Sequence, residues 1–548
     1  MASATINLPR PASASASTSP SPSPSPSQRS TTPRRPLSTA LPVRKIPGDT
    51  GIPLISPIRD RLDYFYFKGR DNYFKSQIQK LQSTVFRTNM PPGPFISTDP
   101  RVIALLDAHS FPTLFDLDKV DKSDVFTGTY TPHLSLTGGH RVLSYLDPTD
   151  PKHTPSKTSF STSSCPPATT SSPNSTPHSD AYSTNSNPTL PPKAKWACFN
   201  FIARSLFNTD PSETDLGTDG PSLIQKWVLF QLSPVLSLGL PWFIEDPLIH
   251  TFRLPPFLVK KDYERLYNFF NKASSKVLDE AEKMGLDRDE ACHNILFATC
   301  FNTFGGFKVF FPTLFKWLGR SGSNLHSKLA AEIRGAVKSN GGSVTMAAME
   351  QMPLMKSAVY EAFRVEPPVP LQYGRAKRDL VVESHDASFE VNRGEMLFGF
   401  QPFATRDSRI FERAEEYVAE RFVGEEGESL LKYVLWSNGR ETDNPTVDNK
   451  QCAGKDLVVL ASRLLVVELF LRYDSFDIEV GKSPIGLAIT ITSLKRASSV
   501  KFANTTYGYM KWTVGPRDEY NCTTQAVGIG VDELVMCELE SYSGQVKL

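Results

Sequence analysis

The sequence predicts a mainly helical fold that also contains small β-sheets, an α+β architecture. Segments whose apolar residues recur at helical spacing are long, whereas segments that alternate or gather turn residues are short. The stretch 295–301 is apolar on most sides, which indicates a buried helix. We expect helices over residues 55–87, 262–283, 287–318 and 456–473, and strands within residues 115–145 and 381–400.

The composition is that of a globular chain with a large core. The 548 residues are 39% hydrophobic and 22% charged, so the chain can form one large fold or several ordinary domains. A net charge of +2, without a basic patch interleaved with aromatic residues, argues against nucleic acid as a partner. The seven cysteines are scattered and include no Cys-x-x-Cys pair. This argues against a disulfide framework and a structural zinc site, and it fits a reducing compartment.

Residues 1–45 have the composition of a plastid or mitochondrial transit peptide. They are rich in Ser, Pro, Ala and Thr, and they contain six basic residues and no acidic one. They lack the apolar core of a secretory signal. A disordered tail without a targeting role has the same composition.

One cysteine lies where a thiolate can be stabilised. Residues 436–456 begin as a polar, turn-prone loop and contain Cys452, which is followed by the apolar run 457–471. This pattern places Cys452 just ahead of a helix N-terminus, where backbone N–H groups and the helix dipole lower the pKa of a thiol. Such a thiolate serves as a nucleophile, a redox sensor or an axial metal ligand. The structural alternative is a buried free cysteine.

A carboxylate and two arginines precede this loop. Glu361 and Arg364 lie three residues apart, so they share one face of a helix and can pair, and Arg421 offers a second guanidinium. A single Glu-x-x-Arg is common on surface helices. A Glu–Arg–Arg cluster ahead of a cysteine loop resembles the core of the cytochrome P-450 superfamily, in which these groups hold the loop that presents a thiolate to haem iron.

The resemblance narrows to the plant hydroperoxide-metabolising branch of that superfamily. Asn-Lys-Gln-Cys-Ala-Gly-Lys-Asp (residues 449–456) resembles the cysteine loop of allene oxide synthases, hydroperoxide lyases and divinyl ether synthases, which is longer than the usual loop. Lys450 stands where the superfamily has Arg. Further matches lie at residues 366–369, 372–377 and 384–386. The resemblance covers residues 46–157 and 194–498 and is strongest to allene oxide synthases.

This resemblance implies a cytochrome P-450 fold, with haem b between a long central helix and the cysteine loop, and Cys452 as the iron ligand. Residues 121–130 resemble the loop over the distal haem face. Lys122, His153, Lys157 and Lys450 match positions that pair with the haem propionates, where cations offset buried negative charge. Each of these four residues alone would be interpreted as a surface residue.

The resemblance also divides the chain. We expect a transit peptide over residues 1–45, a catalytic domain over 46–500, and a tail over 501–548 that is unlike the family. Within the catalytic domain the family pattern is lost over residues 158–193, and the Ser, Thr, Pro and Asn composition of 154–192 predicts disorder. The sharp edges of this segment suggest a shifted reading frame. If the segment is genuine, an inactive haem-protein relic is the alternative from a different class.

The central helix lacks the acid that oxygen activation needs. Residues 291–307 contain no Asp or Glu, so nothing there relays protons as a monooxygenase requires. A fatty-acid hydroperoxide already contains an O–O bond and needs neither O2 nor NADPH, and a thiolate behind haem iron favours cleavage of that bond. Gly305 and Gly306 indicate close approach to a flat cofactor, with a close helix contact as the alternative.

The resemblance implies an allene oxide synthase, a hydro-lyase of jasmonate and oxylipin biosynthesis, in the plastid. By the same resemblance Asn302 is the catalytic asparagine, an uncharged amide that orients the hydroperoxide. Phe126 lies at the position that separates synthase from lyase, and its ring face stabilises an electron-poor carbon. The structural alternatives are an asparagine bonded within the core and a core phenylalanine.

The expected partner is the hydroperoxide substrate, with 13-hydroperoxylinolenate favoured by the plastid leader, and no reductase or nucleic acid. The runner-up function is a hydroperoxide lyase, and a reductase-dependent monooxygenase is less favoured. Residues 227–244 form the best apolar run without charge, but Pro234, Gly239 and Pro241 interrupt it. We interpret this run as a core segment, with a lip resting on a membrane surface as the alternative.

Overall fold

The structure is a computed structural model of the chain. It describes residues 41–97, 99–163, 193–483 and 486–497 and three strands of the tail. Most of the predicted transit peptide and residues 164–192 therefore lie outside the described residues.

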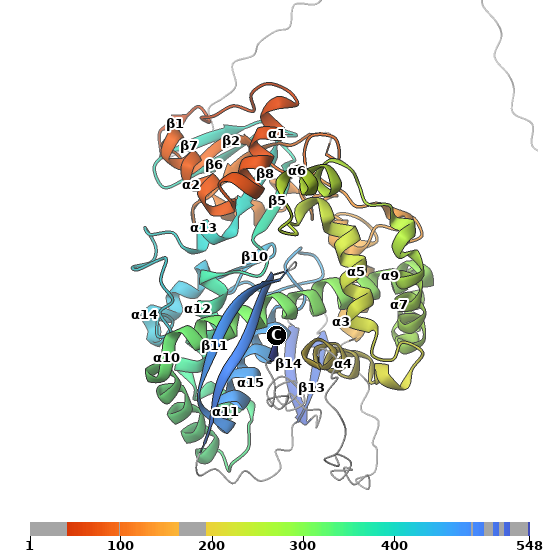
Figure 1. The fold of residues 1–548 in the computed structure, drawn as a ribbon, viewed down its shortest axis with the longest axis vertical. Coiled ribbons are helices and arrows are strands. Elements are labelled where there is room, and N and C mark those ends of the chain that lie inside the picture. Colours follow the sequence, from red (N-terminus) through yellow and green to blue (C-terminus); the bar gives the residue numbers. More distant parts are fainter. Residues whose placement is uncertain are drawn as a thin grey trace, which may run out of the picture. The chain divides into compact units, whose positions relative to one another are not determined.

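Helices form the larger part of the secondary structure, as predicted (Figure 1). The α-helices are α1 (Ile55–Leu62), α2 (Arg70–Leu81), α3 (His153–Ser163), α4 (Lys193–Phe207), α5 (Gly220–Leu232), α6 (Trp242–Glu245), α7 (Lys260–Ala273), α8 (Ser275–Lys283), α9 (Arg288–Leu296), α10 (Gly305–Ser339), α11 (Met346–Glu350), α12 (Pro353–Val365), α13 (Gln401–Thr405), α14 (Gly424–Ser429) and α15 (Lys455–Arg472). Of the short 3-10 and π-helical segments, the argument below uses η1 (Asp63–Phe67), η7 (Asp246–Thr251), η8 (Pro256–Val259) and η9 (Phe297–Phe304).

The strands form small, separate sheets. Their bounds are β1 (Val43–Arg44), β2 (Val85–Asn89), β3 (Arg101–Leu105), β4 (Val120–Asp121), β5 (Leu371–Ala376), β6 (Leu380–Glu383), β7 (Ser388–Val391), β8 (Met396–Phe400), β9 (Leu435–Trp436), β10 (Gly439–Arg440), β11 (Tyr473–Ser483), β12 (Gly486–Arg496), β13 (Gly508–Val514), β14 (Tyr520–Ala526) and β15 (Val546–Lys547). The largest sheet has the order β2-β3-β8-β5-β4, and only its β3–β8 pair is parallel. The strands predicted within residues 381–400 are β6, β7 and β8.

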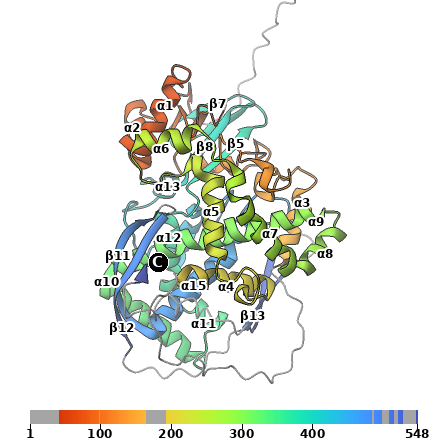
Figure 2. The same ribbon diagram turned by 45° about the vertical axis from the view of Figure 1, so that its right-hand side comes forward.

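The predicted central helix is α9, η9 and α10 in succession, and it carries the core. Two-thirds of its most apolar window is buried, although by length and composition it is also the one helix of the described chain that could cross a membrane. It packs against α12 and α15, and the three helices lie together in both views (Figures 1 and 2). Gly322 interrupts α10 with a φ of 72°, which only glycine adopts readily, so the helix changes direction there. The helix predicted over 456–473 is α15.

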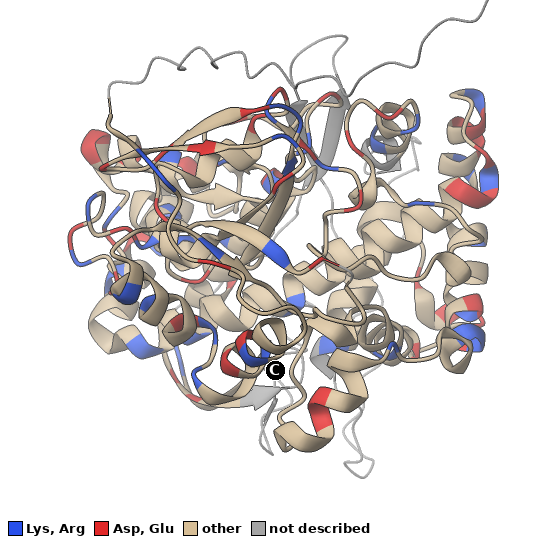
Figure 3. Cartoon of the chain, turned by 90° about the horizontal axis from the view of Figure 1, so that it is seen from above, with Lys and Arg blue, Asp and Glu red and all other residues tan. Residues whose placement is uncertain are grey.

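Many charged residues lie on the outer helices and loops, although others, such as Glu361 and Arg364, are buried. Figure 3 shows basic and acidic residues interspersed over the outer helices and loops on view. This mixture agrees with the small net charge of +2, and the sequence analysis likewise predicted no basic patch.

The strand prediction for residues 115–145 is wrong for most of its length. The region contains only the two-residue strand β4 and several 3-10 turns. Gly128, Gly138 and Gly139 all have positive φ there and turn the chain before a second ladder can form. The single helix expected over 55–87 is also wrong, because it divides into α1, η1 and α2 and gives way to β2.

The disorder predicted from residue 154 is wrong for its first ten residues, which continue α3 to Ser163. Ser and Thr are weak helix formers, but one side of this helix is buried through His153, Ser156 and Lys157. The Lys157 Nζ donates hydrogen bonds to the carbonyls of Asn449 (2.7 Å) and Gln451 (3.2 Å). Tertiary contacts with the cysteine loop therefore override the local preference.

Candidate active site

The predicted Glu–Arg–Arg cluster is present and fully enclosed. Glu361 and Arg364 on α12 have no exposed surface, and the Arg364 guanidinium donates to both carboxylate oxygens at 2.7 and 2.8 Å. Arg421 donates to the same carboxylate at 2.9 Å. Arg364 also donates to the backbone carbonyls of Thr405 and Ala414, at 3.1 and 2.7 Å. The cluster thereby fastens the segment after α13 onto α12.

The cysteine loop is held against the other side of α12. The ring of Trp436, at the start of the loop, lies 4.7 Å from the ring of Phe363. The Gln372 side chain donates to the Trp436 carbonyl at 2.9 Å and accepts from the Asn438 N–H at 2.9 Å. The Cys452 N–H donates to the Ser437 carbonyl at 3.1 Å, which closes the loop on itself.

Cys452 lies immediately before α15, as predicted, and differs from the other cysteines that the structure describes. Cys198, Cys292 and Cys300 are buried, whereas residue 452 keeps some exposed surface although its thiol group is surrounded by protein. The expected lowering of its pKa is wrong as a net effect: burial raises the pKa of this thiol, and the Gly454 N–H and Lys157 only partly oppose the rise. A bound metal cation reverses that balance, because it deprotonates a coordinating thiol.

The four residues predicted to face the haem propionates gather in one place. Burial lowers the pKa of Lys122 to about 7, and burial with the neighbouring Lys157 and Lys122 lowers the pKa of Lys450 to about 7. Burial lowers the pKa of Lys157 to about 8. His153 shares this environment: burial, Lys450 and Lys157 lower its pKa to about 4.

These cations are anchored by backbone carbonyls. Lys122 Nζ donates to the Tyr373 carbonyl at 2.7 Å, and Lys450 Nζ donates to the carbonyls of Leu143 and Leu146 at 2.5 and 2.6 Å. Carbonyls fix the position of an ammonium group without neutralising its charge. Burial disfavours the charged form of these lysines, and an anionic group beside them would favour it, so the cluster is suited to bind an anion.

The central helix changes its winding where the predicted catalytic asparagine lies. Residues 297–304 form the π-helical segment η9 between two α-helices, and such segments are frequent at functional sites. Asn302 is exposed although its neighbours Cys300 and Phe304 are buried. Its Nδ2 donates to the Ser144 Oγ at 3.3 Å. An exposed amide in the middle of a core helix indicates an interior space on that side.

Phe126 joins the same region through aromatic contacts. Its ring makes edge-to-face contacts with Tyr145 at 5.5 Å and with Phe301 at 5.7 Å between ring centroids. Phe301 precedes Asn302, and Tyr145 follows Ser144, which bonds Asn302. The structure thus brings together two predicted site residues that are far apart in the sequence.

Gly305 and Gly306 are not required by a close helix contact. A Cβ atom at Gly306 would meet no heavy atom within 4 Å, and one at Gly305 would meet only the Cys300 carbonyl at 3.8 Å. The alternative of helix packing is therefore wrong. Open space beside these glycines fits the close approach of a flat group.

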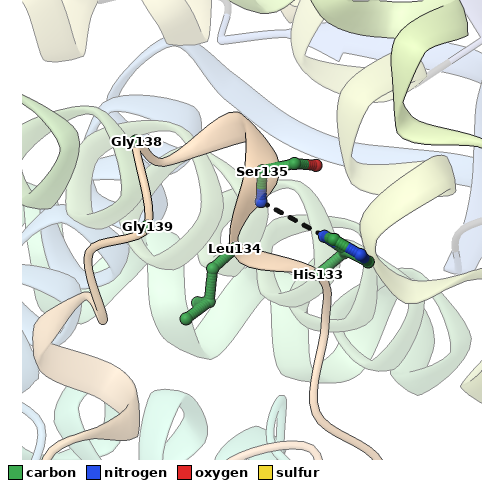
Figure 4. Close-up of a pocket in the computed structure, with 5 residues that line it drawn as sticks. All are labelled: His133, Leu134, Ser135, Gly138 and Gly139. Atoms are coloured by element: carbon green, nitrogen blue, oxygen red, sulfur yellow. Dashed lines mark hydrogen bonds between the residues drawn. The ribbon is translucent and has the colours of Figure 1, made fainter.

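A surface hollow lies apart from these residues. It is lined by the loop that holds His133, Ser135 and Gly138, and the Ser135 N–H donates to the His133 ring at 3.3 Å (Figure 4). None of the predicted site residues lines it, and we assign it no part in the chemistry.

Comparison with known proteins agrees with this arrangement. Residues 323–474 match the family model for cytochrome P450. The chain is 63% identical over 466 residues to allene oxide synthase 1, chloroplastic, of Solanum lycopersicum, which covers 84% of this chain and 87% of that protein. It is 60% identical over 469 residues to the allene oxide synthase, chloroplastic, of Linum usitatissimum (84% and 87% covered). The corresponding Arabidopsis thaliana protein is 56% identical over 476 residues (85% and 92% covered).

The chain belongs to the allene oxide synthase family of cytochromes P450. The predicted family and the predicted P-450 fold are confirmed. Membership implies haem held through a cysteine thiolate. The described residues fit that group: the buried Nδ1 of His153 has no hydrogen-bond partner among them, Lys157 and Lys450 lie close enough to His153 to affect its pKa, and Cys452 offers a thiol for iron ligation.

Two polar residues of the site were missed by the sequence analysis. Ser144 bonds the amide of Asn302, and Glu441 is enclosed within the cysteine loop. A serine and a glutamate in polar, turn-rich stretches carry no signal that distinguishes them from solvent-facing residues. Their contacts emerge only when distant segments meet.

Proposed function

We propose that this chain dehydrates a fatty-acid hydroperoxide to an allene oxide without O2 or NADPH. The observation that carries the proposal is the central helix itself: its residues 291–307 contain no acid, and Asn302 lies there, next to Phe301, whose ring contacts Phe126. The names of the relatives, all allene oxide synthases, support the same activity.

In this proposal Cys452 would hold the haem iron through its thiolate, and Lys122, His153, Lys157 and Lys450 would hold the haem propionates. Haem held in this way would supply the chemistry that cleaves the O–O bond. The propionates would raise the pKa values of these buried lysines, whose positive charge would then offset the two carboxylates, and the carbonyls that bond Lys122 and Lys450 keep their amino groups in place.

Asn302 and Phe126 then determine what becomes of the substrate. The amide of Asn302, held by Ser144, orients the hydroperoxide and adds no base that would compete for its proton. The ring of Phe126 stabilises the electron-poor carbon of the epoxide intermediate. The intermediate therefore loses a proton to give the allene oxide, and its C–C bond is not cleaved. Tyr145 and Phe301 hold that ring at a fixed angle.

Incubation of the purified holoprotein with 13-hydroperoxylinolenate in the absence of oxygen and reductant tests the proposal. We expect the substrate to disappear and ketols, the hydrolysis products of an allene oxide, to appear in mass spectra. Short-chain aldehydes instead would establish a lyase. Turnover only with NADPH and O2 would establish a monooxygenase. A parallel reaction with the 9-hydroperoxide measures the positional preference, for which the plastid assignment favours the 13-isomer.

We also propose that the chain works in the plastid, at a membrane surface. The relatives named above are chloroplastic. The second half of the predicted core run 227–244 is not core: Leu240, Trp242, Phe243 and Ile244 are 41 to 61% exposed. The apolar exposure continues through η7 and η8, and the Phe67 ring lies 6.0 Å from the Trp242 ring. Contiguous exposed apolar surface of this kind suits a lipid interface.

Flotation with vesicles of neutral galactolipid tests the membrane contact. The double variant Trp242→Gln, Phe243→Gln is expected to lose vesicle binding, because each ring is the main apolar surface that its residue exposes. Val480→Gln, at an exposed apolar residue of β11, is the matched control. Equal flotation of both variants and the parent would refute the membrane surface and leave the enzymatic proposal intact.

A further inference from the structure

Glu441 is an enclosed carboxylate that the proposed chemistry does not use. It lies in the part of the cysteine loop by which this family's loop exceeds the usual length. Its two carboxylate oxygens accept separate hydrogen bonds, one from the Tyr360 hydroxyl at 2.8 Å and one from the Trp436 indole N–H at 2.6 Å. The Lys455 ammonium lies 3.6 Å from the carboxylate and 95% of that lysine side chain is buried.

The backbone of Glu441 repeats the same connections. Its N–H donates to the Val434 carbonyl at 2.8 Å, and its carbonyl accepts from Lys455 Nζ at 3.0 Å. One residue thus bonds the strand before the loop, through Val434 and Trp436, and the first residue of α15, which follows Cys452 by three positions. Tyr360 adds a link to α12, next to Glu361.

The remainder of the inserted segment folds back onto the residue that precedes the cysteine. The Gln451 Nε2 donates to the carbonyls of Arg440 (2.7 Å) and Asp443 (3.2 Å), which flank Glu441. Gly439 permits this approach, since a Cβ atom there would lie 2.6 Å from the Gln451 side chain. The insertion is therefore bonded to the chain on both sides of Cys452.

A buried carboxylate is stable only while its partners remain. Removing it leaves the Tyr360 hydroxyl and the Trp436 N–H without an acceptor in a largely water-free place. Lys455 loses one of its two carboxylate partners and keeps Asp456, at 3.1 Å, and the carbonyl of residue 441. The two donors left without an acceptor belong to two different elements, so no small local movement satisfies both. The loop that carries Cys452 then keeps its backbone bonds but loses the side-chain bonds that join it to α12.

We propose that Glu441 is a positioning residue for the Cys452 thiolate. It joins α12, the start of the cysteine loop and the start of α15, and through these contacts it would keep the Cys452 sulfur in place for iron ligation. The usual, shorter loop of the superfamily has no residue that corresponds to Glu441. In this chain the inserted segment therefore supplies contacts that position Cys452. The inference rests on haem ligation by Cys452 and does not require any particular substrate.

The test uses the reduced, CO-bound holoprotein, whose absorbance distinguishes thiolate ligation from ligation by a protonated or displaced cysteine. We expect Glu441→Ala to shorten the half-life of the thiolate form about tenfold at a fixed temperature, equivalent to about 1.4 kcal/mol. Glu441→Gln places an amide oxygen and an amide nitrogen where the two carboxylate oxygens were. Its thiolate half-life is expected to lie between those of the parent and the alanine variant. Tyr360→Phe removes the hydroxyl donor together with its hydrogen bond, so no buried group is left without a partner on the tyrosine side. It is expected to shorten the thiolate half-life less than Glu441→Ala does.

Two control variants separate positioning from general stability. Glu332 is another partly buried carboxylate, which accepts from the Leu354 and Met355 N–H groups at the start of α12 and has no hydrogen bond or ion pair with the cysteine loop among the described residues. Glu332→Ala is expected to lower the melting temperature and leave the thiolate half-life unchanged. Glu428→Gln, which removes an exposed ion pair with Lys356, is expected to change neither.

The proposal is overturned if Glu441→Ala keeps the parent's half-life, or if Glu332→Ala shortens the half-life equally for the same loss of melting temperature. Should Glu441→Ala fail to fold, Glu441→Gln and Tyr360→Phe carry the same test. Hydroperoxide turnover by the parent is measured separately, so a failure of the proposed reaction leaves this result interpretable.

Discussion

The cysteine side and the asparagine side of the site are built from different interactions. Around Cys452 the loop is held by short, directional hydrogen bonds, many between side chains and backbone carbonyls, and by buried ion pairs. Around Asn302 the walls are aromatic rings in edge-to-face contact, and among the described residues the Asn302 side chain makes one hydrogen bond, of 3.3 Å, to Ser144. The hydrogen bonds of the cysteine loop hold Cys452 in one position. The aromatic walls around Asn302 instead provide a surface of defined shape and low polarity for a substrate.

This difference predicts two separable kinds of failure. Changes on the cysteine side are expected to alter haem binding and, through it, every reaction. Changes on the asparagine side are expected to leave the haem spectrum intact and alter only rate or product.

The largest effect is expected for Cys452→Ser. Loss of the thiolate removes the electron donation that favours O–O cleavage, so we expect the turnover of hydroperoxide to fall by more than about 100-fold, beyond the usual effect of an outer-shell change. The CO complex is expected to lose its thiolate absorbance. Cys292→Ser, at a buried core thiol, is the control and should keep both. A Cys452→Ser protein with the parent's spectrum would assign ligation to another residue.

Asn302→Leu tests the other side. Removing one oriented polar group of an active site lowers kcat by about 100-fold to 1,000-fold, and we expect a loss of that order here. The thiolate absorbance of Asn302→Leu should equal that of the parent, whereas a variant on the cysteine side is expected to change it. Thr303→Val, at the next position of η9, serves as the control because its hydroxyl only bonds the Ala298 carbonyl. Equal kcat for Asn302→Leu and the parent would make the asparagine a structural residue.

The pH dependence of haem retention probes the buried cations. Burial lowers the pKa of Lys122 to about 7 without a bound anion, and a propionate beside it raises that pKa. Haem binding is therefore strongest below about pH 7 and weakens as pH rises through that value, by up to about tenfold per pH unit until the pKa of the bound state is reached. Transfer of haem to an excess of a scavenging globin measures the retention. In Lys122→Met the retention should be lower at neutral pH and the slope flatter. A slope equal to that of the parent would show that Lys122 does not titrate with binding.

Phe126→Leu is expected to change the turnover rate least of these variants, but to change which products form. Leucine fills a similar volume yet has no ring face to stabilise an electron-poor carbon. We expect the ratio of aldehydes to ketols to rise while the haem spectrum and the total turnover change by less than about tenfold. Product analysis by mass spectrometry measures the ratio, and Phe65→Leu, at a ring outside the site that stacks on His250, is the control. An unchanged ratio would remove Phe126 from the mechanism.

Sequence reasoning performed best where a residue type has only one chemical use in its context. The pairing of Glu361 with Arg364 followed from helical spacing, and the place of Cys452 before α15 followed from a polar loop that feeds an apolar helix. The strand prediction for residues 115–145 failed because β-branched residues form strands only when a neighbouring strand offers hydrogen bonds, and the glycines there turn the chain first. The predicted disorder of 154–163 failed for the opposite reason, since contacts with the cysteine loop stabilise a weakly helical sequence.

The sequence by itself indicated the chemistry that this chain can perform: a cysteine before a helix, a stretch of the central helix (291–307) without Asp or Glu, and an asparagine and a phenylalanine as the predicted site residues. These are properties of residue identity and short spacing, which act over one or two helical turns. Only the tertiary structure decided which residues support them. Ser144 behind Asn302, Glu441 within the cysteine loop and the carbonyls around the lysines come from segments far apart in the chain, and burial makes their bonds strong only after those segments have met.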